Sequence, residues 1–448
     1  MPSTARGADP EARGHQSEGS ALELVRQIRS KSAAAFFNLA RKAATAEPPR
    51  LALADTWLRA TLQRDPNHAE ARRLLGYVPH EGGWARPFAV RQLAEGKMNH
   101  RLYGWIPAEW LPRLERGELP APASPGQRRV DWLPAEQADQ LRSDIRNPWK
   151  LATEHFELRS NAPLREAVEL THRLEAFYDL FCSMMADVIG ESLPLARRFR
   201  VPSLTAEATY RPHQIVYFAT EADYLDSLRN LAGPGIQGSL GYYNPPPSAR
   251  GARAPAYFFR DPGGRLPDQA TLFHEVSHQL LFETAGPHAY LKNAGNYWVF
   301  EGLGTFFETV VMNADGSMEV GGLVGARVEE ALRSYQAGRF LPLATFVALE
   351  PEAFNRPSSI FVNYQQAMVL TIFLMQGRDQ AYRASFLDYV KDAYRGRIKR
   401  GSGRSLQDRL GRAYEDLELE FREFLETEGG RAQGRSQTDP SDREGGGR

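Results

Sequence analysis

The hydrophobic pattern changes along the chain and predicts helices towards both ends with strands between them. From Ala21 to about Tyr77, apolar residues recur every three or four positions, as in amphipathic helices. Between Thr153 and Phe259, short runs alternate apolar and polar residues, as in strands. The chain therefore predicts an α+β fold with a small mixed sheet. The expected strands are Thr153–Arg159, Gln214–Thr220, Ser239–Asn244 and Ala256–Phe259, and the expected helices after Trp149 include Leu164–Val188, Glu221–Leu231, Leu323–Gln336, Asn363–Met375, Ala381–Tyr394 and Leu406–Glu426.

Composition and turn signals divide the chain into five segments. Both ends, 1–20 and 429–448, are rich in small and charged residues and are expected to be disordered. Residues 21–125 form a helical amino-terminal region with turns anchored by tryptophans, and 126–148 form a linker helix after a proline-rich stretch. The remaining residues, 149–428, are expected to form the largest domain.

The amino-terminal region contains a stop-and-restart signal at Asp65–His68, which predicts a helical hairpin. The hairpin resembles one tetratricopeptide-like unit, although a plain hairpin packed on the rest of the protein fits the same pattern. If the resemblance holds, this region could bind a protein partner. Trp84, Trp105 and Trp110 follow in short echoing segments and are expected to fill cores.

The whole-chain numbers exclude several classes of function. The chain has 448 residues and a formal net charge of zero, so no global field favours nucleic acid or an anionic membrane. The single cysteine, Cys182, excludes an internal disulfide and a multi-cysteine metal site, and its apolar surroundings predict a buried thiol. No apolar run is long enough to span a bilayer, and the first twenty residues lack the apolar core of a signal peptide. We expect a cytoplasmic protein. Export would require a different start codon that adds a signal peptide.

The strongest chemical signal is His274-Glu275-x-x-His278. Residues four apart share one face of a helix, so both imidazoles can reach one metal ion while Glu275 lies beside the water that the ion holds. Asp268 is the expected N-cap of this helix. This pattern is typical of zinc hydrolases, in which the carboxylate acts as general base. A solvated His-Glu pair on a surface helix is the alternative.

A catalytic zinc site needs a third protein ligand. Leu281 and Thr284 stand where the metzincin pattern has glycine and histidine, which excludes that branch. The next candidate is Glu301, on a second amphipathic run. Glu308 lies seven residues later on the same helical face, where it can hold the free ring nitrogen of a ligating histidine.

HEVSH followed by W-x-x-E-G-x-x-x-x-x-E resembles the gluzincin metallopeptidases. This group includes aminopeptidase-N-like enzymes and peptidase-MA-like bacterial domains, and the chain is similar to the bacterial family called domain of unknown function 1570. The resemblance covers roughly 149–426 and implies a zinc site made of His274, His278 and Glu301, with Glu308 behind it. The connector before Glu301 is longer than in the aminopeptidases, and no exopeptidase motif precedes it.

The resemblance also implies two further parts of the site. Tyr364, which opens an apolar helical run, matches a tyrosine that stabilises the tetrahedral intermediate; a core tyrosine with a satisfied hydroxyl is the alternative. The last strand before the metal helix is expected to be an edge strand that pairs with an extended peptide. Its residues are Ala256, Tyr257, Phe258 and Phe259, and the loop at 245–255 is a candidate lid.

The sequence therefore predicts zinc-dependent hydrolysis of peptide bonds in a peptide or protein substrate, with Glu275 as general base. The alternative from another class is a non-catalytic scaffold with a structural or idle metal site. A third reading keeps the same site but hydrolyses a non-peptide amide or ester.

Overall fold

The computed structural model describes residues 10–122, 130–190, 194–201, 211–233, 236–245, 253–261, 263, 268–285, 296–313, 316–323, 325–398 and 402–438; for 10–26, 194 and 428–438 it describes the backbone alone. The chain forms two compact units. The first combines Met1–Val90 with Leu193–Ala208, and the second combines Arg91–Ser192 with Thr209–Arg448. The HExxH motif lies in the second unit. The expected domain boundaries at 125/126 and 148/149 stay predictions.

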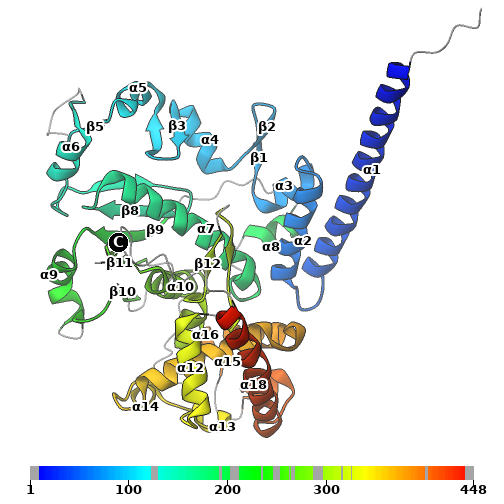
Figure 1. The fold of residues 1–448 in the computed structure, drawn as a ribbon, viewed down its shortest axis with the longest axis vertical. Helices are drawn as coiled ribbons and strands as arrows, with labels where there is room; N and C mark the ends of the chain where they lie inside the picture. Colours follow the sequence, from blue (N-terminus) through cyan, green and yellow to red (C-terminus); the bar gives the residue numbers. More distant parts are fainter. Residues whose placement is uncertain are drawn as a thin grey trace, which may run out of the picture. The chain divides into compact units, whose positions relative to one another are not determined.

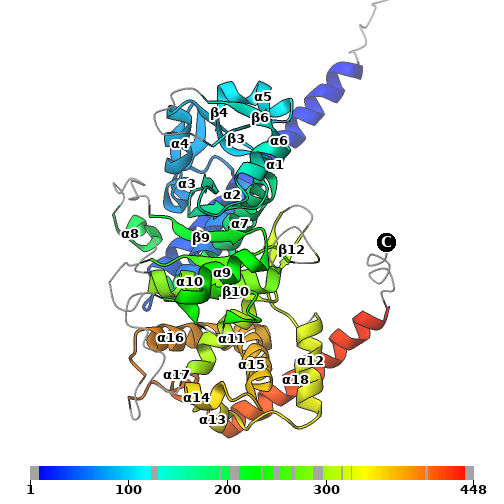
Figure 2. The same cartoon turned by 90° about the vertical axis from the view of Figure 1, so that its left-hand side faces the viewer.

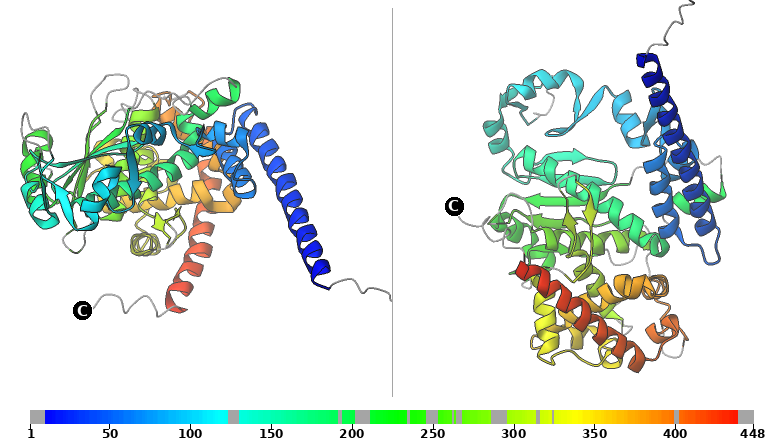
Figure 3. Two further views of the ribbon diagram at one scale, coloured as in Figure 1. Left: turned by 90° about the horizontal axis from the view of Figure 1, so that it is seen from above. Right: turned by 45° about the vertical axis from the view of Figure 1, so that its right-hand side comes forward.

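The first unit is helical. Its elements are α1 (Pro10–Ala44), α2 (Leu51–Arg64), α3 (Ala69–Leu75) and α8 (Pro194–Arg200). Helices α1 and α2 lie side by side (Figure 3), and their buried residues Ala40 and Leu58 join a core with Leu74 and Leu195. The helical hairpin expected around Asp65–His68 is confirmed, because α2 ends at Arg64 and the His68 side chain caps α3 by accepting from Ala71 N.

Two expectations of disorder are wrong over part of their length. Helix α1 begins at Pro10, inside 1–20, and α18 (Tyr414–Thr438) continues past residue 428. Composition predicted disorder there, but a helix already formed by the neighbouring residues extends without a new nucleation cost. Residues 1–9 and 439–448 lie outside the described part of the chain.

Three hairpin-helix segments follow the first helices, and they are the basis of the echoes seen in the sequence. In the last two, the segment before the helix reads Trp-x-Pro-Ala-Glu, at 105–109 and 132–136. The same backbone bond opens both helical segments: Ala108 N donates to Gly96 O at 3.0 Å, and Ala135 N donates to Gly117 O at 2.9 Å. The elements are β1 (Val78–His80), β2 (Gly83–Ala85) and α4 (Pro87–Ala94); β3 (Lys97–His100), β4 (Gly104–Pro107), η1 (Ala108–Trp110) and α5 (Leu111–Glu115); and β5 (Glu118–Pro120), β6 (Trp132–Pro134) and α6 (Ala135–Leu141).

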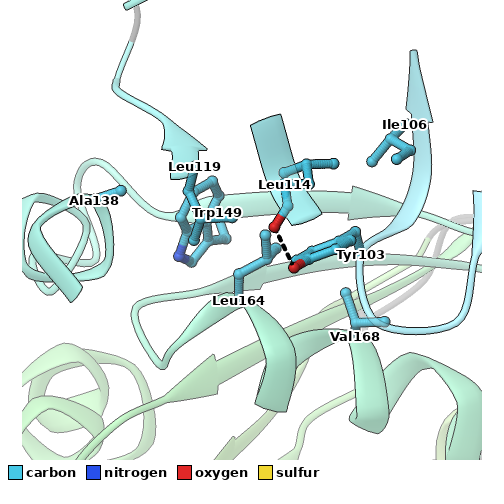
Figure 4. Packing of buried hydrophobic residues seen from close by; sticks show 8 residues of the cluster. All are labelled: Tyr103, Ile106, Leu114, Leu119, Ala138, Trp149, Leu164 and Val168. Carbon is cyan, nitrogen blue, oxygen red and sulfur yellow. Dashed lines mark hydrogen bonds between the residues drawn. The ribbon is translucent and has the colours of Figure 1, made fainter. Parts of the chain in front are cut away.

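The last two of these segments pack on the start of the large sheet and on α7 (Leu164–Ile189). Figure 4 shows the shared core, in which Tyr103 and Leu114 meet Trp149 and Leu164. The Tyr103 hydroxyl donates to Leu114 O at 2.8 Å, so its buried polar atom is satisfied. Trp105 and Trp110 are half-buried, with Trp110 packed against this core.

The second unit is built on a five-stranded sheet with the order β10-β11-β9-β8-β7 (Figure 1). The three inner strands run parallel, and the two outer strands are antiparallel to their neighbours. The sheet confirms the small mixed sheet expected from the sequence. The strands are β7 (Trp149–Ala152), β8 (Phe156–Ser160), β9 (His213–Phe218), β10 (Gly241–Tyr243) and β11 (Ala256–Phe259).

Alternate residues of the sheet pack on helices at its two faces. Val216, Phe218 and Phe259 pack with Tyr224 of α9 (Glu221–Ala232). Phe258, one position earlier in β11, points to the other face, where the ring lies close to Gly241 and α10 (Gln269–Ala285). Alternation in β9 and β11 thus places α10 against the sheet.

The prediction that Ala256, Tyr257, Phe258 and Phe259 form an edge strand is wrong. Strand β11 is hydrogen-bonded to β10 on one side and to β9 on the other. Its backbone groups are therefore occupied and cannot pair with a further strand. Strand β10 follows β9 in sequence but adds outside β11, and it forms that edge of the sheet.

The chain after α10 is mostly helical, and its helices gather on the side of α10 away from the sheet (Figures 1 and 2). Helix α11 packs on α10 and on α15, and α12 packs on α15. No helix within the described ranges is long and apolar enough to cross a bilayer. The elements are α11 (Tyr297–Phe307), β12 (Val311–Met312), β13 (Met318–Glu319), α12 (Ala326–Gln336), α13 (Leu343–Phe346), α14 (Pro351–Phe354), α15 (Ile360–Gln380), α16 (Arg383–Tyr394), α17 (Leu406–Leu410) and α18.

Candidate metal centre

Helix α10 begins at the N-cap that the sequence predicts. The Asp268 carboxylate accepts hydrogen bonds from the backbone N–H of Thr271 at 2.8 Å and from its hydroxyl at 2.9 Å. Phe273 and Val276 are buried on the expected apolar stripe. The cap and the stripe fix the start and the rotation of the helix, so His274 and His278 lie one turn apart on one face.

Three ligand atoms converge between α10 and α11. The Nε2 atoms of His274 and His278 are 3.0 Å apart, and Oε2 of Glu301 lies 3.4 Å from the first and 3.7 Å from the second. Two ligands at 2.0–2.1 Å from a tetrahedral zinc ion are about 3.4 Å apart. All three residues are buried. His274, His278 and Glu301 therefore form a group that could hold a metal ion, as the sequence predicted.

His274 is oriented by a carboxylate behind it. Its Nδ1 lies 2.8 Å from Oε1 of Glu308, and the other oxygen of Glu308 pairs with Arg327 of α12. Once a metal ion displaces the hydrogen of Nε2, an Nδ1 hydrogen donated to Glu308 leaves the Nε2 lone pair facing the other two ligand atoms. Gly304 makes room for the ring, because a Cβ there would lie 2.7 Å from His274.

His278 is oriented by packing instead. Its ring stacks on Phe300 with centroids 3.7 Å apart and planes 5° from parallel. Among the described residues, Nδ1 of His278 has no hydrogen-bond partner. The two histidines are thus fixed by different means, one by a charged hydrogen bond and the other by an aromatic face.

Glu275 lies beside the ligands and next to the edge strand. It is half-buried, and its carboxylate lies near the backbone N–H of Tyr243 in β10. Burial raises the pKa of Glu275 to about 7, with His274 opposing the rise and Glu301 adding to it. A carboxylate with a pKa near neutrality can both accept and release a proton.

Tyr364, at the start of α15, reaches the same centre. Its ring is nearly parallel to that of His274, with centroids 6.5 Å apart, and it lies close enough to Glu301 to feel the charge of that carboxylate. Burial and the charge of Glu301 raise the pKa of Tyr364 well above its ordinary value, so the phenol keeps its hydrogen and can donate it.

The charges within the ligand group are strongly coupled. Burial lowers the pKa of His278 to about 4. Burial also lowers that of His274, but hydrogen bonds to Glu301 and Glu308 outweigh it and raise the pKa to about 10. The same histidines hold the pKa of Glu301 below its ordinary value despite its burial. The carboxylate is therefore ionised, which is the form that binds metal.

The structure thus brings together His274, His278, Glu301, Glu308 and Tyr364, with Glu275 adjacent. Sequence reasoning missed three other residues that orient them, which are Tyr297, Phe300 and Arg327. Tyr297 lies four residues before Glu301 on α11, and that helical spacing could have identified it. Arg327 comes from α12, and no local pattern links it to Glu308.

Two other histidines of the second unit and the cysteine have partners or positions outside the metal group. His155 bonds to Glu175 at 2.7 Å, and His213 bonds to buried Glu283 at 2.5 Å, so both are satisfied. Cys182 is half-buried rather than fully buried. His288 and most of the candidate lid at 245–255 lie outside the described residues.

A comparison with protein families agrees with this placement. Residues 268–395 match the family described as "Protein of unknown function (DUF1570)", which is the family named from the sequence. The matched segment begins at the cap of α10 and contains every residue of the metal group. No curated protein matches the chain. The description of the family states no activity.

Proposed function

We propose that the protein is a zinc metallopeptidase that hydrolyses peptide bonds. The observation that carries the proposal is the tetrahedral spacing of three buried ligand atoms beside a carboxylate that is not one of them. Two imidazoles and one carboxylate are a catalytic rather than a structural zinc set. When bound there, zinc would polarise the substrate carbonyl and acidify water.

The protein's own residues divide the remaining work. Glu275, whose pKa burial raises to about 7, takes a proton from the attacking water and passes it to the leaving nitrogen. Tyr364 donates its hydroxyl hydrogen to the oxyanion that develops on the carbonyl. Glu308 keeps the ring of His274 in place.

The sheet edge beside Glu275 supports a peptide as substrate. Strand β10 pairs with β11, and within the described residues no strand pairs with its other side. An extended chain added there would run past Glu275, since the backbone of Tyr243 in β10 lies near that carboxylate. The proposed peptide-binding strand is therefore Gly241–Tyr243.

The test combines a zinc assay with a mixed peptide library. We expect one zinc ion per chain, cleavage that stops with chelator, and a Glu275→Gln variant that keeps its zinc but loses about 100- to 10,000-fold in turnover. Glu221→Gln, which changes an exposed carboxylate on α9, is the control and should behave like the wild type. Stoichiometric zinc with no cleavage of any peptide would favour a scaffold, and cleavage confined to amides or esters outside peptides would change the substrate class.

A further inference from the structure

The two oxygens of the Glu301 carboxylate have different surroundings. Oε2 faces the histidines, at 3.4 Å from His274 Nε2 and 3.7 Å from His278 Nε2. Oε1 faces the other way and accepts the hydroxyl of Tyr297 at 2.6 Å. One oxygen is thus available to a metal ion, while the other is already hydrogen-bonded.

The hydroxyl of Tyr297 is fixed by its own neighbours. Its ring packs edge-on against Phe354 of α14, with centroids 5.2 Å apart and planes at 73°. A phenol has a single hydrogen, and the bond of 2.6 Å to Oε1 of Glu301 uses it.

A second tyrosine also lies near this carboxylate, but it has another task in the proposed reaction. Burial and the nearby charge of Glu301 raise the pKa of Tyr364. A hydroxyl that turns towards the substrate cannot hold Glu301 at the same moment. Tyr297 has no such task, because it lies on the same helix as Glu301, one turn before it.

We infer that Tyr297 is a positioning residue that makes Glu301 bind a metal through one oxygen. A carboxylate without this partner is free to rotate and to offer both oxygens to the ion, which would fill the position that water and substrate need. The inference rests on the proposal that the three residues hold a metal ion, and it does not depend on the nature of the substrate.

The experiment uses the full-length protein stripped of metal and titrated with cobalt(II) or zinc. For the wild type we expect cobalt(II) visible bands of the strength typical of four-coordination. Tyr297→Phe should weaken these bands as a second carboxylate oxygen binds, and zinc affinity should fall by about 10- to 100-fold. An unchanged cobalt spectrum in Tyr297→Phe would overturn the inference.

Tyr394→Phe is the matched control. Tyr394 is buried and close enough to Glu301 to feel its charge, yet within the described residues its hydroxyl has no hydrogen-bond partner. The cobalt(II) spectrum of Tyr394→Phe should equal that of the wild type. A change as large as in Tyr297→Phe would also overturn the inference. Should Tyr297→Phe fail to fold, Tyr297→Leu removes the same hydroxyl and should weaken the bands in the same direction, whereas an unchanged spectrum would count against the inference. A wild-type protein that binds neither metal would defeat the proposed metal site itself.

Discussion

At the scale of single residues, the centre depends on the side chains that orient each residue of the metal group. His274 is held by Glu308, which is in turn paired with Arg327. The side chain of Glu308 is 6% exposed and that of Arg327 is 55% exposed. Hydrogen bonds to buried charged groups contribute more than ion pairs in contact with solvent, so the two residues should matter to different degrees.

We therefore predict a ranked loss of zinc affinity. Glu308→Gln should weaken zinc binding by about 10- to 100-fold, because the ring of His274 loses its charged acceptor. Arg327→Gln should weaken it only a few-fold, since solvent screens that pair. Competition with a chromophoric chelator measures both. Arg333→Gln, which changes another exposed arginine of α12, is the control, and an Arg327→Gln loss as large as that of Glu308→Gln would contradict the ranking.

Gly304 gives a second prediction at this scale. A Cβ at this position would lie 2.7 Å from the ring of His274, closer than real Cβ contacts come. Glycine to alanine within a helix otherwise stabilises by about 0.5–1 kcal/mol. Gly304→Ala should therefore fold but displace His274 and lose zinc affinity by at least about tenfold. Wild-type affinity in this variant would show that the ring is not confined there.

At the scale of elements, the site depends on the close approach of α11 and α15. A Cβ on Gly302 would lie 2.5 Å from Thr371 Oγ1 and 3.0 Å from the backbone oxygen of Ala367. The glycine is therefore required by contact between helices, next to ligand Glu301. Tyr364, on the facing helix, is held at the centre by the same contact.

Gly302→Ala should separate the two helices and lower the free energy of unfolding by about 1–3 kcal/mol. Denaturant unfolding measures this loss. Combining it with Thr371→Ala should recover part of the loss but not all, because the oxygen of Ala367 remains in the way. Full recovery in the double variant, or none, would contradict this account of the contact.

The elements themselves were largely predictable from local sequence, whereas their neighbours were not. Strand β11 has the bounds expected, and Asp268 caps α10 as expected. The order of strands in the sheet depends on contacts between segments that are distant in sequence. The alternation of apolar and polar residues within one strand does not determine which strands become its neighbours. For this reason β11 was wrongly expected at the edge, where three-residue β10 lies.

At the scale of the whole second unit, the metal group joins two layers. His274 and His278 come from α10, which packs on the sheet, and Glu301 comes from α11, which packs on α15. The ligands were predictable because each motif lies within one helix, and the spacing of helical residues is fixed. Their partners Arg327 and Tyr364 come from two other helices, and Tyr364 was found by family resemblance rather than by spacing.

A metal ion that ties these layers together should stabilise the fold as a whole. Free zinc at 100 times its dissociation constant contributes about 2.7 kcal/mol if the unfolded chain does not bind it. We therefore predict that zinc raises the melting temperature of the metal-free protein by several degrees and that chelator reverses the rise. Glu301→Ala removes one of the three ligands and should melt at the same temperature with and without zinc. An equal rise in that variant would place the stabilising ion at another site, because a centre that has lost its only ligand from α11 no longer links the two layers.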